Sequence, residues 1–509
     1  MNRLASSLVR DVAASLVVFL VAIPLCLGIA IASGVPVAMG LVSGVVGGLV
    51  VGFLAGSPLQ VTGPAAGLAV IVFGFVQQHG IAALGPVLVA AGLLQVLAGI
   101  LRIGSWFRAI SPAVVHGMLA GIGILIILGQ AHVLMGGRPA AGAIENVAAL
   151  DESLGRLLGP SVTTEAVALL VGLISLLAMI GWEKVRPRSL SLLPGALVGV
   201  VAGTALTAAL RLPIPRVELP ESLFAGLALP TLDAFAVLAQ PGVLVAVLVI
   251  AVIASAETLL SAAAVDRMHD GARTRFDKEL VAQGVGNGIC GLLGGLPITG
   301  VIVRSSANVQ AGARSRVSTI LHGVWILGLV ALAPALLEQA PLTALAAVLL
   351  VTGFRLIGLG HVRALFARHG PAPVGIWGAT VTMVIVEDLL VGVAVGLALS
   401  LLEILPHLRR RLAIERQDQG DAIQLGLRGA ATCKDVPALL AALEDLPEGR
   451  KVRLVGEGLR YMDHTSAETM SDWVRREARA GRPMEVRQPK AWRHPRLGPI
   501  FARLSAETA

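Results

Sequence analysis

Nine apolar runs separated by short polar loops constrain this chain more than any other feature of its sequence. Runs of this kind predict helices that cross about 30 Å of hydrocarbon. They cover residues 11–32, 38–56, 83–101, 112–130, 163–181, 190–209, 241–264, 318–337 and 341–354. Hydrophobic residues make up 55% of the 509 positions and charged residues only 14%, which excludes an ordinary water-soluble globule. The sequence therefore predicts a polytopic α-helical membrane protein. We interpret the first run as a retained helix and not as a signal peptide, because it is too long and contains Pro24.

The positive charge of the chain is spread over the loops and is not gathered in one patch. Between residues 11 and 408, one set of alternate loops carries fourteen cations and the other set carries four. The first set comprises Arg102, Arg108, Lys184, Arg186, Arg188, Arg267, Arg273, Arg275, Lys278, Arg314, Arg316, Arg355, Arg363 and Arg368. Because cytoplasmic loops are enriched in Lys and Arg, we expect this set and both termini to face the cytoplasm, in a multi-pass protein of the cell inner (cytoplasmic) membrane. The formal charge of +8 then reflects contact with membrane lipid and does not predict a nucleic-acid partner.

A short segment broken by glycine and proline, "VTGPAAGL", lies at residues 61–68. It follows Gly52–Pro58, which aligns with Gly291–Pro297 at four of seven positions. Val61–Gly63 then corresponds to Ile298–Gly300, so the chain contains an internal repeat. Interrupted segments at matching positions of two halves are typical of transporters whose binding site lies near the bilayer midplane.

A helix that begins inside the membrane explains such a break in physical terms. Its first N–H groups are free and the positive end of its dipole points into the protein, so two such helix starts would face an anion. We expect Gly63 and Pro64 at the first start, with the proline in the first helical turn, and Ala65 and Ala66 leaving room for the ligand. Close packing of helices through small residues is the alternative interpretation.

Two ionisable residues, Glu257 and Arg304, lie within apolar segments, where a charge is costly and usually serves a function. Arg304 comes just after the second break. We assign it to the anion site together with Val303, Ser305 and Ser306, the two serines as nearby hydrogen-bond donors. A structural salt bridge between Arg304 and Glu257 is the alternative.

Four segments carry a resemblance to a known family: "FLVAIPLCLGIAIASGVP", "VTGPAAGL", "ETLLSAAAVDRMHDGARTRFDKELVAQGVGNGICGLLGGLPITG" and "VIVRSSANVQAGARSR". Over about residues 8–488 the chain resembles the sulfate permease family, SulP, also called solute carrier family 26. The resemblance implies 14 membrane segments in two inverted seven-segment repeats, at about 8–210 and 235–408, divided into a core and a gate domain. It also implies an elevator-like movement that carries one anion across the membrane, and a homodimer.

Glu257 and Ser261 lie one helical turn apart and face the same way. In bicarbonate-transporting members of the family, an acid and a hydroxyl at the matching positions take part in a sodium site. The resemblance therefore implies a coupling ion here, with Thr299 and Gly300 beside it. Glutamate as the acid is shared with members regarded as proton-coupled, so Na⁺ and H⁺ both stay open. No other cofactor is expected, because the three cysteines have no disulfide or metal-ligand spacing.

The chain changes character after the membrane region. Short strands are predicted at Ile423–Leu427, Lys451–Val455 and Met484–Val486. Helical patterns alternate with them, which predicts a small α/β domain over residues 412–509 after a transmembrane transport domain over 1–411. The small domain resembles the cytoplasmic STAS domain that ends many members of the family, with Asp463–Ser466 at its strand-to-helix turn. We expect a helix N-cap at this turn, and phosphorylation of Thr465 or Ser466 is the alternative.

Together these features favour secondary active transport of a small inorganic oxyanion, either bicarbonate or sulfate. Many eukaryotic relatives have a proline-glutamine pair where this chain has Pro24-Leu25-Cys26, which fits an anion held mostly by backbone amides. A nucleobase or urate transporter of the same fold is one alternative, although residues 62–68 offer few side chains that could hydrogen-bond to the donors and acceptors of a base ring. An uncoupled exchanger or channel is another. No catalytic motif predicts an enzyme, and we interpret the membrane histidines, His322 among them, as packing or loop residues.

Overall fold

The computed structural model describes most of the chain. The described residues are 2–104, 111–140, 142–157, 163–187, 190, 193–219, 230–266, 268–269, 271–387, 389–407, 412–420, 422–447, 449–487 and 497–508. Of the cations used above to predict membrane sidedness, Arg108, Arg188 and Arg267 lie outside them, as does the expected domain boundary after residue 411. The sidedness of the loops and the boundary stay predictions. The chain divides into two compact units, Met1–Gly104 with Leu119–Ile357, and Ser105–Met118 with Gly358–Ala509.

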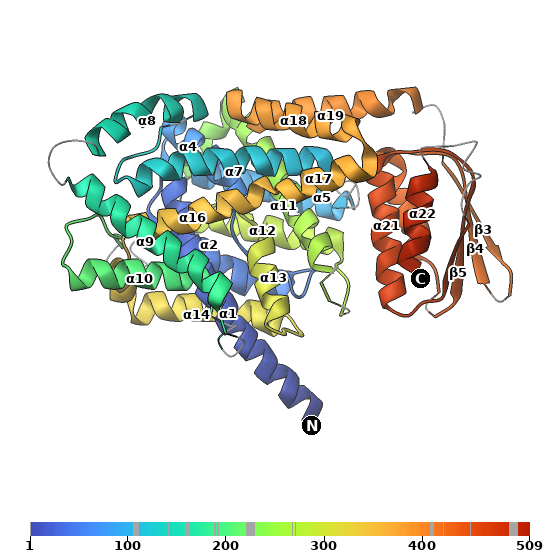
Figure 1. The fold of residues 1–509 in the computed structure, drawn as a ribbon, viewed down its shortest axis with the longest axis horizontal. Coiled ribbons are helices and arrows are strands. Elements are labelled where there is room, and N and C mark those ends of the chain that lie inside the picture. The colour runs from blue at the N-terminus through green and yellow to red at the C-terminus, as the bar shows by residue number, and fades with distance from the viewer. Residues whose placement is uncertain are drawn as a thin grey trace. The chain divides into compact units, whose positions relative to one another are not determined.

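Helices make up nearly all of the first unit (Figure 1). Its α-helices are α1 (Asn2–Ala32), α2 (Val37–Val46), α3 (Gly52–Leu54), α4 (Ala66–His79), α5 (Leu84–Ile100), most of α7 (Pro112–Leu134), α8 (Ala143–Leu157), α9 (Thr164–Val185), α10 (Gly195–Ala209), α11 (Pro241–Asp266), α12 (Phe276–Leu293), α13 (Ile302–Gln310), α14 (Val317–Leu332), α15 (Pro334–Glu338) and α16 (Leu342–Ile357). A π-helical turn, η1 (Gly47–Val51), joins α2 to α3, and η2 (Ile81–Ala83) and η4 (Leu232–Ala239) are 3₁₀ turns. Two three-residue strands, β1 (Thr62–Pro64) and β2 (Ile298–Gly300), interrupt the helices.

Seven helical stretches of the described chain are long and apolar enough to cross a membrane. They are Ser7–Ala32, Val37–Leu54, Ile81–Ile100, Pro112–Leu134, Thr164–Val185, Pro241–Asp266 and Leu342–Ala367. Each coincides with one of the nine runs predicted from the sequence. The other two runs form shorter helices than expected, since α10 has 15 residues and α14 has 16. The prediction of a polytopic helical membrane protein is confirmed.

Small residues bring α5 and α12 into close contact. Gly85, Gly92 and Gly99 follow one another at seven-residue spacing on α5, so they lie on the same face of that helix. A β-carbon on Gly85 would lie only 2.8 Å from the carbonyl oxygen of Gly291, and one on Gly99 would lie 2.8 Å from that of Asp277. Between lipid-embedded helices, such close backbone approach replaces the hydrophobic effect as the source of packing energy. The packing holds α12, and the strand that follows it, in place.

The second unit contains the start of α7, three further helices and a small α/β fold. The helices are α17 (Leu359–His369), α18 (Pro371–Val386) and α19 (Leu389–Ile404), followed by the 3₁₀ turn η5 (Leu405–His407). The α/β fold comprises β3 (Ala413–Asp418), β4 (Ala422–Ala431), the 3₁₀ turn η6 (Cys433–Asp435), α20 (Val436–Glu444), β5 (Lys451–Met462), α21 (His464–Arg479), β6 (Met484–Arg487) and α22 (Gly498–Thr508). The three strands predicted from the sequence are confirmed as β4, β5 and β6, whereas β3 and α22 were not predicted.

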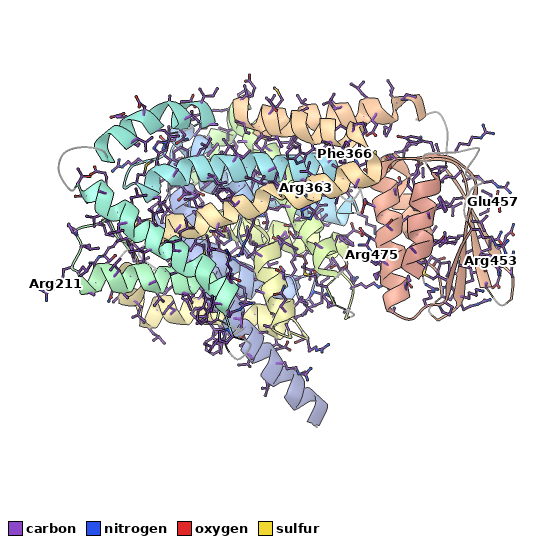
Figure 2. The ribbon with its side chains drawn as sticks, in the orientation of Figure 1. Arg211, Arg363, Phe366, Arg453, Glu457 and Arg475 are labelled. Atoms are coloured by element: carbon purple, nitrogen blue, oxygen red, sulfur yellow. The ribbon has the colours of Figure 1, made fainter. Side chains whose placement is uncertain are left out.

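The four strands form one sheet in the order β3-β4-β5-β6, with β3 antiparallel to β4 and the other pairs parallel. Helices α21 and α22 lie side by side against one face of this sheet (Figure 1). Trp473 of α21 and Phe501 of α22 fill the core against Leu454. Figure 2 shows Arg453 and Glu457 on the side of the sheet away from these helices. The alternation of buried and exposed residues along β5 therefore has a direct structural cause.

The turn that precedes α21 is an N-cap, as predicted. The Asp463 carboxylate accepts the N–H of Ser466 at 2.7 Å and the N–H of Cys433 at 2.6 Å. The Asp463 side chain therefore links the start of α21 to the start of η6, the turn that follows β4. The hydroxyl-bearing residues Thr465 and Ser466 are buried, at 3% and 0% exposure. A kinase would need them at the surface, so the structure argues against the phosphorylation alternative.

Candidate functional site

The two broken segments of the repeat meet as an antiparallel pair of strands. In the register, Thr62 lies opposite Gly300, Gly63 opposite Thr299, and Pro64 opposite Ile298. Each strand is followed at once by a helix, because α4 begins at Ala66 and α13 at Ile302. The internal repeat predicted from the sequence thus corresponds to a structural pair of strand-to-helix segments.

The structure corrects one detail of the first segment. The prediction placed Pro64 in the first turn of a helix, but Pro64 ends β1 and Ala65 is the N-cap of α4, with extended backbone angles. Proline has no N–H to contribute to a strand ladder, and a three-residue strand loses little by including it. Gly63 likewise lies in the strand, whereas Ala66 is the first helical residue as expected.

Side chains from neighbouring helices satisfy the backbone groups of the strands. The side-chain amide of Asn287 on α12 bonds to both backbone groups of Ile298. Its oxygen accepts the Ile298 N–H at 2.8 Å and its nitrogen donates to the Ile298 carbonyl at 3.1 Å. Thr258 of α11 accepts the N–H of Gly300 at 3.1 Å. The N–H of Val301 donates to the Val61 carbonyl at 2.9 Å. Non-helical backbone is tolerated within a membrane protein only when its N–H and C=O groups are hydrogen-bonded in this way. We call the paired strands β1 and β2 the strand crossing, and its backbone is stabilised by the surrounding helices.

Arg304 is the central charge of this region. It lies in the first turn of α13 with 0% exposure, and none of its three side-chain nitrogens has a hydrogen-bond partner among the described residues. Its Nη1 lies directly against Gly63, where a β-carbon would overlap it. The thiol of Cys26 on α1 lies close to the guanidinium. A buried guanidinium without partners is costly unless a ligand of opposite charge completes it.

The alternative of a structural salt bridge is wrong. Among the described residues, Arg304 and Glu257 form no ion pair, and Oε2 of Glu257 is itself buried without a hydrogen-bond partner. A β-carbon on Gly67 would lie 2.9 Å from that oxygen. Arg304 lies against Gly63 of β1, whereas Glu257 lies against Gly67 in the first turn of α4.

The remaining predicted residues are divided between the ligand region and the scaffold. The Ser305 hydroxyl accepts the N–H of Val61 at 2.9 Å and donates to the carbonyl of Val301 at 2.8 Å. The Ser306 hydroxyl donates to the carbonyl of Val303 at 3.1 Å. Both hydroxyl hydrogens are thus used within the protein, which argues against the predicted role of these serines as donors to the anion. Val303 is partly exposed in the first turn of α13.

The predicted coupling residues gather beside Glu257. Ser261 follows it by one turn on α11 and is 7% exposed. The Thr299 hydroxyl is buried without a hydrogen-bond partner, and Gly300 next to it is tied to α11 through Thr258. These oxygen atoms suit a hard cation such as Na⁺ in chemical type. No group of three or more histidine, cysteine, aspartate or glutamate side chains that could hold a metal ion occurs among the described residues.

Sequence reasoning missed several buried polar residues around the strands. Glu279 of α12 has 0% exposure and accepts the N–H groups of Gly56 and Ser57 at 2.8 and 2.9 Å. Gln283, one turn later, donates to the Thr62 hydroxyl at 2.7 Å. Gln60 donates to the carbonyl of Thr258 at 2.9 Å, and its own amide oxygen is buried without a partner. Glu279 was overlooked because it follows the basic loop residues Arg275 and Lys278, so the sequence indicated a loop residue, whereas it lies in the first turn of α12.

A separate cavity lies beside the middle of α4. It has a volume of about 40 Å³, is lined by Val70 and Phe73 of α4 and by Gln130 of α7, and includes none of the predicted site residues. It has room for a few water molecules only. The charged region at the strand crossing is the better candidate for a functional site.

Comparison with known proteins agrees with this architecture. The sequence profile described as "Sulfate permease family" matches residues 8–380. The putative sulfate transporter YvdB of Bacillus subtilis is 32% identical over 421 residues, which cover 80% of this chain and 76% of YvdB. The bicarbonate transporter BicA of Synechocystis is 26% identical over 362 residues, covering 68% of this chain and 60% of BicA.

Two solved structures share the fold. The transmembrane domain of a cyanobacterial bicarbonate transporter BicA superposes with a TM-score of 0.67 at 24% identity, covering 76% of this chain and 97% of that one. The structure of SLC26A9 superposes with a TM-score of 0.69 at 15% identity, covering 99% of this chain and 86% of that one. The extent of the profile match and the identity to YvdB, together with the paired strand-to-helix segments, show that this chain belongs to the sulfate permease family.

Proposed function

We propose that this protein transports a small inorganic oxyanion across the membrane, by an elevator-like movement of the part that contains the strand crossing. The observation that carries the proposal is the fully buried guanidinium of Arg304, which has no partner among the described residues. Two helix starts, at Ala66 and Ile302, lie beside it and add their free N–H groups. The names of YvdB and BicA, a putative sulfate transporter and a bicarbonate transporter, support the same substrate class.

The coupling ion is the second part of the proposal. Glu257 and Ser261 of α11 and Thr299 of β2 provide a carboxylate and two hydroxyls. A cation or proton bound there would place a positive charge near the anion, so the two ions would favour each other's binding. We propose Na⁺ or H⁺ as the co-transported ion. We also propose a homodimer with both termini in the cytoplasm, as the family resemblance implies.

Transport is tested with the purified full chain in proteoliposomes. Uptake of labelled sulfate and labelled bicarbonate is measured while a sodium gradient or a pH gradient is imposed separately. The proposal expects uptake of at least one oxyanion, stimulated by one of the two gradients. Binding of uracil without binding of either oxyanion would contradict it and favour the nucleobase alternative. Uptake that neither gradient stimulates would favour an uncoupled exchanger or channel.

The role of Arg304 is tested by Arg304→Gln, with Arg211→Gln as the matched control. Arg211 is an exposed residue just after α10, labelled in Figure 2. Because Arg304 has no partner that its removal would strand, the variant is expected to keep its thermal stability and lose oxyanion uptake. The control is expected to keep both. Normal uptake by Arg304→Gln would show that Arg304 does not bind the anion, and would leave the proposal without its main support.

A further inference from the structure

A serine, a histidine and a glutamate from three separate elements meet in the second unit. Oγ of Ser111 lies 2.6 Å from Nε2 of His464, and Nδ1 of His464 lies 3.5 Å from Oε2 of Glu403. Ser111 directly precedes α7, Glu403 lies in the last turn of α19, and His464 is the first residue of α21. We call these three residues the joint, because they connect the small α/β domain to the ends of α7 and α19.

The hydrogen-bond roles within the joint follow from its chemistry. A carboxylate can only accept, so the hydrogen of a neutral imidazole belongs on Nδ1, facing Glu403, and Nε2 then accepts the O–H of Ser111. Serine hydrolases use the same order of groups. Ser111 is only 1% exposed and His464 only 5%, which leaves a substrate no access to the hydroxyl. We therefore interpret the set as a contact between elements and not as a catalytic triad.

Close packing leaves the start of α7 little freedom to move on its own. A β-carbon on Gly117 of α7 would lie 2.9 Å from the carbonyl oxygen of Trp377 on α18. One on Gly396 of α19 would lie 3.1 Å from a methyl carbon of Val114 on α7. After Met118 the same helix continues into the first unit, which contains the strand crossing. A rigid helix that is shared by both units can carry a displacement from one to the other.

We propose that the small α/β domain sets the rate of transport through this joint, and that His464 is the residue through which it holds the start of α7. The proposal rests on the oxyanion transport proposed above and adds its regulation. An elevator-like movement needs a support that stays in place while the strand crossing moves, and the joint fixes the start of α7 for this role. The joint belongs to the second unit and the strand crossing to the first. Changes in the joint are therefore expected to alter the maximal rate and not the affinity for the anion.

The first test measures uptake of labelled sulfate and labelled bicarbonate by variants of the full chain in proteoliposomes. Ser111→Ala and His464→Ala are each expected to lower the maximal uptake rate by about threefold or more, while the dissociation constant of the anion stays within about twofold. Both variants break the same hydrogen bond, so the double variant should be no slower than the slower single variant. An unchanged rate in His464→Ala would overturn the proposal, and so would a double variant in which the two losses multiply.

The charge of the joint is tested by Glu403→Gln, which removes the charge and keeps the shape of the side chain. Glu457→Gln is the matched control, because it makes the same change on the side of the sheet away from α21 (Figure 2). Glu403→Gln is expected to slow uptake by about twofold or more, since a charged acceptor binds an N–H more strongly than a neutral one. The control is expected to keep the original rate. Equal slowing in both variants would overturn the proposal, and so would an equal loss of anion affinity in Glu403→Gln.

Hydrogen exchange tests the joint without any transport measurement. In the purified full chain, His464→Ala is expected to speed amide exchange in a peptide that covers the start of α7, because Ser111 is no longer held there. Glu457→Gln is expected to leave this exchange unchanged. Unchanged exchange in His464→Ala would overturn the joint. If the unmodified protein takes up neither anion while the exchange changes as expected, the proposed transport fails together with the rate-setting role, and the joint itself is confirmed.

Discussion

The backbone of Gly63 lies directly against the guanidinium of Arg304, so closely that a β-carbon at position 63 would overlap Nη1. The two residues come from different halves of the internal repeat and meet where β1 pairs with β2. Glycine is required here for close approach, since any side chain would push the cation away from the strand. The relationship explains why the break in the first apolar segment contains a glycine at this position.

Gly63→Ala is therefore expected to displace Arg304 and weaken oxyanion binding by about tenfold or more, a loss of roughly 1.4 kcal/mol. The measurement is the dissociation constant of sulfate or bicarbonate on the purified variant. Gly74→Ala is the matched control, because Gly74 lies on α4 with nothing within 4 Å of its added β-carbon. Equal affinity in the two variants would show that the contact with Gly63 does not position Arg304.

Glu257→Gln is expected to abolish gradient-driven uptake and to leave oxyanion binding within a few-fold of the original. The carboxylate has no ion pair with Arg304, so its neutralisation leaves no buried charge unpaired, and the thermal midpoint should stay the same or rise. Uptake under an imposed gradient and the melting temperature are measured on the same sample. A marked fall in melting temperature would assign Glu257 a structural role, and normal driven uptake would exclude it from coupling.

Glu279→Gln, unlike Glu257→Gln, is expected to lower the stability of the protein. Oε2 of Glu279 accepts the N–H groups of Gly56 and Ser57, and Oε1 accepts the amide of Gln283 at 3.1 Å. The NH₂ group of a glutamine would face donors at one of these two positions, and its neutral oxygen is a weaker acceptor at the other, at a cost of about 2–3 kcal/mol. The melting temperature should fall clearly. Glu338→Gln, at an exposed position of α15, serves as the control and should melt normally. A stable Glu279→Gln variant would mean that the loop before β1 is held by other contacts.

Cys433 is expected to react slowly with alkylating reagents at neutral pH. Burial, and then the nearby carboxylate of Asp463, raise the pKa of its thiol to about 11. Because the thiolate is the nucleophile, the labelling rate should be low at pH 7 to 8 and rise steeply toward pH 11. The pH dependence of iodoacetamide labelling at Cys433, followed by mass spectrometry, checks this. Rapid labelling at pH 7.5 would contradict it.

The sequence by itself determined the membrane class, the internal repeat and the position of Arg304. Each of these depends on local signals: the length of the apolar runs, the matching glycines of Gly52–Pro58 and Gly291–Pro297, and one cation in an apolar segment. The strands and first helices of the small α/β domain were equally accessible, because alternation and helical spacing are properties of neighbouring residues. The resemblance to the family rested on the same contiguous segments.

Only the tertiary structure decided what each polar residue does. Whether Arg304 pairs with Glu257 depends on how α11 and α13 are placed in space. Whether the Ser305 hydroxyl serves a ligand or the Val61 peptide depends on two segments that meet across more than two hundred residues of chain. The same holds for the hydrogen bonds of Glu279 and for the place of Pro64 in a strand. A side chain's hydrogen bonds are set by its nearest neighbours in space, and no pattern within one segment of sequence specifies those neighbours.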